Sequence, residues 1–370
     1  MNVAGRVDVL SGPGGDVADP AALRLSLRSW GDELDLDVKF RELSTAAGLR
    51  ASVREAGPDI VGLVLNAAVG PLLRDALAST AVPAVLVSLG LPPDAATGPV
   101  VHIRGRGLDG YRWALRHLLA MKAWAPETLA YGPRPDQVAD LRRPAGTDRV
   151  PVVVLLHGGF WRVKWGRDLM DAVALDLANR GWATWNVDYR RVGSVDGGWP
   201  ATLTDVASAV DALAPLAPSR RFDLSRVATV GHSAGGQLAL WLAGRPRWQP
   251  VDVRAVVGLA PICDLAAAAG AGLGHGATED FMGGPPQQRS DRYRQASPAA
   301  RLPLGVPQLL VHGDRDGKVP IAMSRDYAAA AASDGDHVEL VVATGADHMD
   351  VIDPKSAAWA IVGEWLAATL

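Results

Sequence analysis

The sequence predicts an α/β protein with two successive domains, each built around a mainly parallel sheet. Short apolar runs rich in β-branched residues alternate with longer Ala- and Leu-rich stretches along the chain, which is the pattern of βα units. In the second half, polar residues gather where the apolar runs end, and open parallel sheets bind ligands at that edge. The chain has 370 residues, a length that suits two domains of about 100–200 residues.

The first half reads as a small doubly wound domain. Its expected strands are Arg6–Leu10, Asp37–Leu43, Ile60–Asn66, Ala84–Leu89 and Val100–Ile103. Its expected helices are Ala21–Leu34, Ala46–Ala56, Pro71–Ser79 and Leu108–Lys122. Five strands that alternate with helices predict a parallel sheet covered on both faces.

We place the domain boundary near Ala123, so that the domains are 1–122 and 123–370. The Pro- and Gly-rich stretch that follows reads either as a linker or as an opening hairpin, with strands Thr128–Tyr131 and Gln137–Leu141. The later expected strands are Val150–Leu156, Ala183–Asp188, Val227–Gly231, Ala255–Leu259, Gln308–His312 and Val338–Val342. The later expected helices are Asp168–Arg180, Thr202–Leu213, Gly235–Ala243, Met323–Ser333 and Ser356–Leu370.

Composition excludes several classes of protein. Lys and Arg number 37 against 40 Asp and Glu, so there is no basic footprint for nucleic acid and no polybasic membrane anchor. No apolar run approaches the roughly 20 residues that span a bilayer, and no secretory signal is visible, so we expect a cytoplasmic protein. The single cysteine, Cys263, rules out an internal disulfide and a four-cysteine zinc site.

A nucleophile motif stands in the second half. Gly231-His232-Ser233-Ala234-Gly235 fits the pattern G-x-S-x-G, after an apolar strand and before a helical run. In that setting the serine hydroxyl is exposed on a sharp turn, and the small residues on either side let strand and helix approach closely. Ser233 is therefore the candidate nucleophile.

A serine nucleophile needs a base and an orienting carboxylate, and on this type of fold they follow in the order serine, acid, histidine. Asp316 follows the strand Gln308–His312, and His348 follows the strand Val338–Val342. Asp314 competes with Asp316 for the role of the acid. Each candidate leaves the carboxyl end of a strand, so the three side chains are expected to converge.

The tetrahedral intermediate needs backbone N–H donors for its oxyanion. His157-Gly158-Gly159-Phe160-Trp161 follows the strand Val150–Leu156. The N–H groups beside its two glycines, with the N–H of Ala234, would form such a hole.

The second half resembles the α/β-hydrolase family, in the branch of HGG-type esterases that includes kynurenine formamidase-like enzymes. The resemblance covers 126–370 and rests on His157–Trp161, Tyr189-Arg190-Arg191, Trp199-Pro200, Gly231–Gly236, Ser297-Pro298, His312–Pro320 and Gly345–Asp350. It implies Ser233 as nucleophile, His348 as base and Asp316, four residues before Pro320, as acid. It also implies Gly158, Gly159 and Ala234 as oxyanion donors, and neither metal nor organic cofactor.

Residues next to these motifs have plainer interpretations as well. His157 is either part of the substrate pocket or a histidine that holds its loop by hydrogen bonds. Phe160 and Trp161 are candidates for lining the pocket, Trp161 being the better one. His232 and His312 are expected to be structural, and the remaining histidines lack the spacing of metal ligands. The stretch Asp264–Leu302 is either a loop that shapes the pocket or a surface insertion.

The first half resembles type II 3-dehydroquinate dehydratase over about Val7–Leu119. The resemblance rests on Gly12-Pro13-Gly14, Phe40-Arg41-Glu42, Ile60–Ala68, Leu73–Leu77, Val82–Val87 and Gly107–Leu115. It implies a flavodoxin-like fold and assembly into oligomers. Asn66, Asp75 and Arg112 match the family, but its base tyrosine, loop arginine and acid histidine are absent. We therefore expect a non-catalytic domain that serves as an oligomerisation scaffold or as a binding module.

The sequence thus predicts a serine hydrolase that acts on small-acyl esters. One alternative is arylformamidase, in which the same residues act on an N-formyl anilide. A second, of another class, is a ligand-binding or oligomerisation protein that works through the dehydratase-like domain. A further hypothesis links the two halves. If the first half binds a cyclohexane polyol acid, the hydrolase acts on esters of that acid.

Overall fold

The computed structural model describes residues 5–12, 19–56, 60–66, 82–90, 101–146, 148–247 and 249–370. The helix predicted over Pro71–Ser79 lies outside these ranges. The chain divides into two compact units, Met1–Ala125 and Pro126–Leu370, each of which has its own sheet. None of the helices in the described ranges combines the length and the apolar composition that a bilayer crossing requires.

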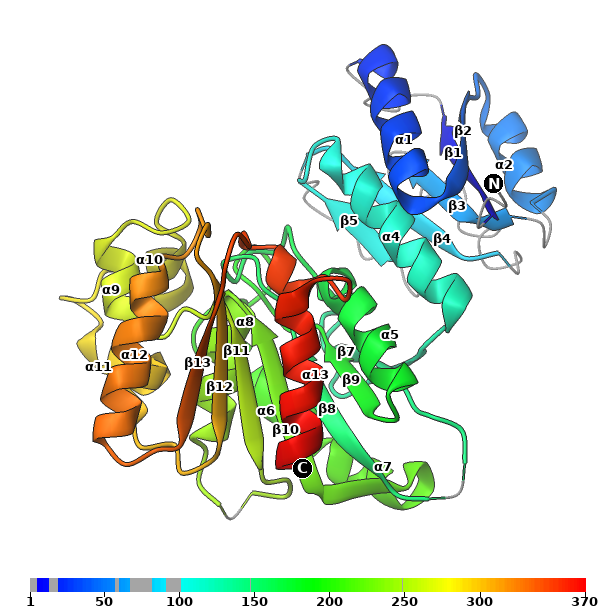
Figure 1. Cartoon of the computed structure of the whole chain (residues 1–370). Helices are drawn as coiled ribbons and strands as arrows, with labels where there is room; N and C mark the ends of the chain where they lie inside the picture. The colour runs from blue at the N-terminus through cyan, green and yellow to red at the C-terminus, as the bar shows by residue number, and fades with distance from the viewer. Residues whose placement is uncertain are drawn as a thin grey trace. The chain divides into compact units, whose positions relative to one another are not determined.

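The first unit holds a five-stranded parallel sheet, drawn in blue to cyan in Figure 1. Its strand order is β2-β1-β3-β4-β5, which is the flavodoxin-like order predicted for this half. The strands are β1 (Gly5–Ser11), β2 (Leu36–Glu42), β3 (Ile60–Asn66), β4 (Ala84–Ser88) and β5 (Val101–Arg104).

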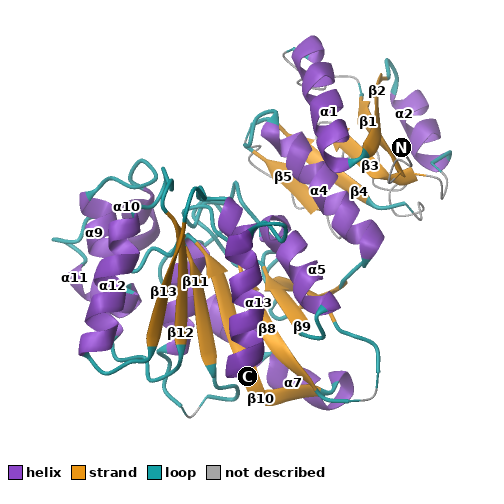
Figure 2. Ribbon diagram, viewed as in Figure 1, coloured by secondary structure: helices purple, strands orange, loops and turns teal. Residues whose placement is uncertain are grey.

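Helices cover both faces of this sheet, as Figure 2 shows. They are α1 (Pro20–Leu34), α2 (Ala46–Arg54) and α4 (Asp109–Ala123). Alternate residues of each strand enter two separate apolar clusters, because successive side chains of a strand point to opposite faces. Val7 and Val9 pack with α1 and α4, whereas Leu10 packs with α2. The doubly wound arrangement predicted from the sequence is therefore confirmed.

The second unit holds an eight-stranded sheet in the order β13-β12-β11-β10-β8-β9-β7-β6. The expected hairpin forms, since β6 pairs antiparallel with β7, which in turn lies antiparallel to β9. The other neighbours are parallel. The strands are β6 (Glu127–Ala130), β7 (Val138–Arg142), β8 (Val150–Leu156), β9 (Ala183–Val187), β10 (Phe222–His232), β11 (Ala255–Leu259), β12 (Gln308–Gly313) and β13 (Val338–Ala343).

Two helix layers enclose the parallel part of this sheet. The helices α5 and α13 cover one face, where Trp359 Nε1 donates to Asp176 Oδ2 over 2.7 Å, and α6 and α8 cover the other (Figure 1). The helices are η2 (Arg167–Met170), α5 (Asp171–Asn179), α6 (Ala201–Asp211), α7 (Leu213–Arg220), α8 (Ala234–Ala243), α9 (Leu265–Gly270), α10 (Ala277–Met282), α11 (Ser290–Ala296), η3 (Pro298–Arg301), α12 (Ile321–Ser333), η4 (Asp350–Ile352) and α13 (Ala357–Thr369).

Two segments differ from the expectation. The stretch Asp264–Leu302 is not a plain loop, because it folds into α9, α10, α11 and η3, and the side chain of Asp264 caps α9. The helical region expected to stop at Leu213 continues as α7, although Pro218 lies inside that helix. A proline disfavours a helix interior but does not forbid it when packing compensates, and Leu213 is fully buried.

The buried indole of Trp185 gives a test of this core. Its ring is fully buried on β9, and its Nε1 donates to the carbonyl of Ala209 in α6 over 2.8 Å. We expect Trp185→Ala to lower the free energy of unfolding by about 3–5 kcal/mol, because it leaves a large cavity. Urea unfolding measures the change. Val195→Ala is the control, since Val195 is 72% exposed; equal effects of the two variants would contradict the prediction.

Candidate active site

The turn that carries Ser233 is tight and strained. Strand β10 ends at His232, α8 begins at Ala234, and Ser233 between them has φ 57° and ψ −118°. A non-glycine residue in such a conformation costs about 1–3 kcal/mol and persists only where the surroundings hold it. The neighbouring glycines are required here. A Cβ at Gly231 would collide with the carbonyl oxygen of Gly235, and a Cβ at Gly235 would collide with the carbonyl oxygen of Leu156.

Backbone hydrogen bonds hold the strained residue. The N–H of Ser233 donates to the carbonyl of Leu259 at the end of β11 over 2.8 Å. The carbonyl of Ser233 accepts from the N–H groups of Gly236 and Ile262, at 2.9 and 3.2 Å. Two neighbouring segments therefore fix the serine, which is only 1% exposed.

The predicted acid and base are in contact. Asp316 follows β12, His348 follows β13, and His348 Nδ1 lies 2.6 Å from Asp316 Oδ2. The carboxylate is 1% exposed. Burial alone would raise the pKa of Asp316, but hydrogen bonds from His312 and His348 and the charge of His348 hold that pKa well below its usual range. An ionised carboxylate on Nδ1 leaves Nε2 of His348 as the free basic nitrogen.

Asp314, the competing acid, has a different partner. Its Oδ1 accepts from the N–H of Gly345 over 2.7 Å, within the loop that follows β13. Asp316 also lies 3.2 Å from Nε2 of His312, whose Nδ1 contacts the hydroxyl of Ser324. The geometry therefore pairs Asp316 with His348, and Asp314 with the loop backbone.

His232 connects the histidine loop to the nucleophile turn. Its Nε2 lies 2.9 Å from the carbonyl oxygen of His348, and the two rings pack with centroids 4.6 Å apart. Burial, with the nearby charge of His348, lowers the pKa of His232 to about 3, so the ring is neutral near pH 7. His232 immediately precedes Ser233, so this contact brings the loop of His348 next to the serine.

The glycine loop, His157–Trp161, lies against the same turn. A Cβ built on Gly158 would stand 3.0 Å from Cβ of Ser233 and 2.8 Å from Nδ1 of His232. Gly159 has φ 112°, a conformation that only glycine adopts without strain. Ala234 is the first residue of α8, where a helix leaves its N–H groups without partners inside the helix. The structure thus places Gly158 within contact distance of Ser233, and Ala234 is its neighbour in the chain.

The three predicted pocket residues occupy different environments. His157 is fully buried, with ring contacts on both nitrogens. Trp161 is also fully buried; its ring stacks on Phe281 of α10 at 4.6 Å, and its Nε1 donates to Gln237 over 3.0 Å. Phe160 is half-buried against Gly274 and has φ 54°. The ring of Trp161 therefore belongs to the buried core. The ring of Phe160 packs against the connection between α9 and α10.

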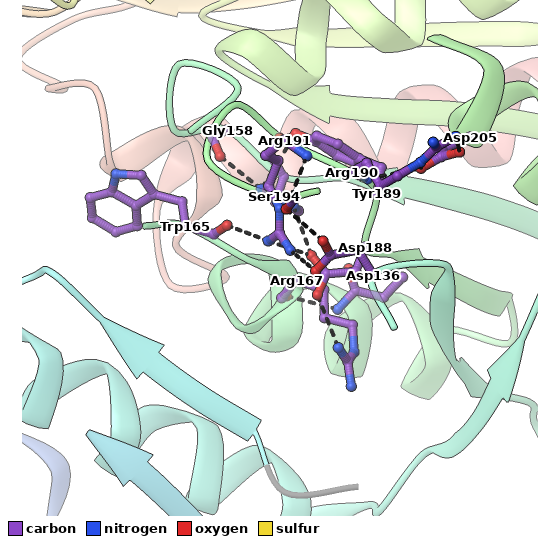
Figure 3. A network of polar contacts seen from close by, with 12 residues as sticks. Asp136, Gly158, Trp165, Arg167, Asp188, Tyr189, Arg190, Arg191, Ser194 and Asp205 are labelled. Atoms are coloured by element: carbon purple, nitrogen blue, oxygen red, sulfur yellow. Dashed lines mark hydrogen bonds and ion pairs between the residues drawn. The ribbon is translucent and has the colours of Figure 1, made fainter. Parts of the chain in front are cut away.

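A buried network of charges lies beside the glycine loop (Figure 3). Asp188 follows β9 and contacts Nε2 of His157 at 3.1 Å, Arg191 at 2.8 Å and Arg167 at 3.1 Å. Arg191 also pairs with Asp136 of the β6–β7 loop at 2.6 Å. Burial would raise the pKa of Asp188, but the two arginines and His157 hold it well below its usual range, so the carboxylate is charged.

Sequence reasoning missed three residues that support the site. Asp188 was read only as the end of a strand, His312 only as a structural histidine, and Gln237 was not singled out. Gln237, on the second turn of the helix after Ser233, joins Trp161 to the carbonyl of Ala296. A polar residue in an otherwise apolar helix was the available signal, because buried amides require partners. The described residues hold no cluster of three or more His, Cys, Asp or Glu side chains suited to a metal ion.

Comparisons with known proteins agree with this fold. Residues 139–330, more than half of the chain, match the BD-FAE family model. Esterase LipC of Mycobacterium tuberculosis is 30% identical over 247 residues, which are 60% of this chain and 59% of LipC. The chain thus spans less than two thirds of that relative.

Solved structures resemble the second unit. A truncated carbohydrate esterase from gut microbiota is 17% identical, with a TM-score of 0.57 over 65% of this chain and 94% of its own. Esterase Est2 of Thermogutta terrifontis is 21% identical, with a TM-score of 0.55 over 66% of this chain and 90% of its own. At these identities the likeness shows the fold, and the α/β-hydrolase fold predicted for the second half is confirmed. The chain belongs to the BD-FAE family.

Proposed function

We propose that the second unit is a serine hydrolase of carboxylic esters. The observation that carries the proposal is the 2.6 Å contact between Asp316 and His348. His232 contacts the backbone of His348 and immediately precedes Ser233, so this pair lies beside the strained serine turn. A nucleophile on a sharp turn, an imidazole and a buried ionised carboxylate are the three parts of this chemistry. The esterase relatives support the same reading.

The proposed reaction has two halves. The Oγ of Ser233 attacks the ester carbonyl carbon while Nε2 of His348 takes the hydroxyl proton, and Asp316 stabilises the imidazolium that forms. The N–H groups of Gly158, Gly159 and Ala234 are the proposed donors to the oxyanion. His348 then gives its proton to the departing alcohol oxygen, which leaves an acyl-enzyme. Water, activated by the same histidine, releases the carboxylic acid and restores Ser233.

We further propose that the acyl group is small. Ser233 is only 1% exposed, and the stacked rings of Trp161 and Phe281 fill the core beneath the glycine loop. Two structures of Est2 from Thermogutta terrifontis are described with bound propionate and butyrate, although their identity to this chain is only 20–21%. The arylformamidase alternative uses the same residues, and it is distinguished by its substrate.

The first test is hydrolysis of 4-nitrophenyl acetate and butyrate by the wild type and by Ser233→Ala, with N-formylkynurenine in parallel. We expect a burst of nitrophenol and then steady turnover in the wild type. The variant should lose both, with kcat lower by on the order of 10⁴ or more, because no other group forms the acyl-enzyme. Equal rates in the two proteins would refute the serine mechanism, and faster formamide hydrolysis would favour arylformamidase.

A second test distinguishes the two aspartates of the β12 loop. Asp316→Asn should lower kcat by on the order of 10³–10⁴, because the amide no longer selects the productive form of His348. Asp314→Asn removes a carboxylate from the same loop and is the matched control, expected to retain most of kcat. The same steady-state assay measures both, and a larger loss in Asp314→Asn would reverse the assignment of the acid.

For the first unit we propose a dehydratase-like domain that assembles the protein rather than catalysing a reaction. The flavodoxin-like strand order supports the resemblance. Arg112, a match to the family, pairs with Glu33 of α1 at 2.6 Å, as a surface charge would. Asp75 and the side chain of Asn66 lie outside the described residues. Sedimentation velocity of the full chain should detect oligomers, and a monomer throughout the micromolar range would contradict the scaffold role.

A further inference from the structure

The direction of an oxyanion donor is set by the carbonyl of the preceding residue. In a planar trans peptide the C=O and the following N–H point in opposite directions. A hydrogen bond that fixes the carbonyl of His157 therefore fixes the N–H of Gly158. In the same way, a bond to the carbonyl of Gly158 fixes the N–H of Gly159.

Both carbonyls have buried partners in this structure. The hydroxyl of Tyr189 donates to the carbonyl of His157 over 2.7 Å. Nδ1 of His157 lies 2.7 Å from the carbonyl oxygen of Gly158. The rings of His157 and Tyr189 stack with centroids 4.4 Å apart and are nearly parallel. Both side chains are fully buried, so water does not compete for these bonds.

Asp188 holds the imidazole in this orientation. Its Oδ1 lies 3.1 Å from Nε2 of His157. The carboxylate of Asp188 at Nε2 and the carbonyl oxygen of Gly158 at Nδ1 therefore hold the ring from both sides. Arg191 and Arg167 fix the carboxylate in turn, at 2.8 and 3.1 Å.

Arg191 also fixes the segment that follows the glycine loop. Its Nη1 donates to the carbonyl of Trp165 over 2.5 Å (Figure 3). The adjacent backbone adds two bonds, because the N–H of Val192 donates to Trp161 and the N–H of Val163 donates to Val192. One segment, 188–192, therefore holds the loop through side chains and backbone together.

We propose that Asp188 and Tyr189 are positioning residues that aim the N–H groups of Gly159 and Gly158 at the oxyanion. The inference rests on the proposed function, since it assigns a cause to the geometry of the oxyanion hole. Neither residue touches the substrate: Tyr189 acts through the carbonyl of His157, and Asp188 acts through the ring of His157 on the carbonyl of Gly158.

The test uses the full chain with Tyr189→Phe and Asp188→Asn. Tyr189→Phe removes only a hydroxyl, and Asp188→Asn keeps the shape of the side chain while removing its charge. Tyr327→Phe is the matched control, because that buried hydroxyl donates to Gln308 at the start of β12, away from the loop. For each protein we would measure kcat and KM for 4-nitrophenyl acetate, and the inhibition constant of an aryl trifluoromethyl ketone. This inhibitor adds to a serine and carries a tetrahedral oxyanion.

Misaimed donors should weaken transition-state binding and leave ground-state binding nearly intact. We expect kcat to fall by about 10–100-fold in Tyr189→Phe and in Asp188→Asn. This loss is smaller than the roughly 10²–10³-fold loss when a donor is removed outright. The inhibition constant should rise by the same factor as kcat/KM falls, with KM little changed. Tyr327→Phe should match the wild type. A role in folding alone would move the melting temperature without this parallel change.

Several outcomes would overturn the proposal. If Tyr189→Phe and Asp188→Asn both matched Tyr327→Phe in kcat and in the inhibition constant, the positioning role would be wrong. It would also be wrong if KM rose while inhibitor affinity stayed constant. Labelling of Ser233 by a fluorophosphonate, read by mass spectrometry, tests the proposed function separately. A wild type that is neither labelled nor active would overturn that function and this inference with it.

Discussion

The left-handed backbone of Ser233 is the constraint on which the geometry of the second unit depends. A residue with φ 57° and ψ −118° does not hold itself in place. The end of β11 binds its N–H, the segment after β11 binds its carbonyl, and the first turn of α8 closes over it. The glycines on either side allow these segments to come within backbone contact. The parallel strands that surround β10 are therefore the means by which the Ser233 turn is held in place.

The carboxyl edge of the second unit's sheet is stabilised by charge as well as by apolar packing. Burying a carboxylate is costly unless cations and hydrogen bonds compensate. Asp188 meets that condition with two arginines and a histidine, and Asp316 meets it with two histidines. Removal of one partner would leave a buried charge uncompensated, so these clusters tolerate little rearrangement. Both lie at the carboxyl ends of strands, where a reaction needs side chains in fixed places.

Much of this arrangement could be predicted from the sequence because it follows local rules. The alternation of apolar runs and helical stretches predicted the strands of both sheets, and the pattern around Ser233 predicted the turn between β10 and α8. The pairing of Asp316 with His348 followed from their places after two neighbouring strands. The first two signals lie within a few residues of the features that they predict. The third joins residues 32 positions apart, and it was available because the order of serine, acid and histidine after successive strands is typical of this turn motif.

The remainder depends on contacts between segments far apart in the chain. Nothing near Asp188 indicates that its partner is His157, which is 31 positions away on another strand end. Gln237 and Trp161 are 76 positions apart, and their bond ties the nucleophile helix to the glycine loop. The α9–α11 segment was also missed, because its Gly- and Pro-rich composition resembles a loop. Tertiary packing and the capping of α9 by Asp264 stabilise helices that local propensity does not favour.

The β6–β7 hairpin has a consequence for where the second unit can be separated as a transferable module. The hydroxyl of Tyr131 donates to the carbonyl of Asp188 over 2.6 Å, and Asp136 binds both Arg191 and Ser194. A fragment that began at β8 would keep every residue of the proposed triad and every proposed oxyanion donor. It would nevertheless lose the contacts of Tyr131 and Asp136 with the segment 188–194, which holds the glycine loop. Recombination or domain grafting that preserves this support must therefore keep the hairpin with the rest of the second unit, although the hairpin holds none of the proposed catalytic residues.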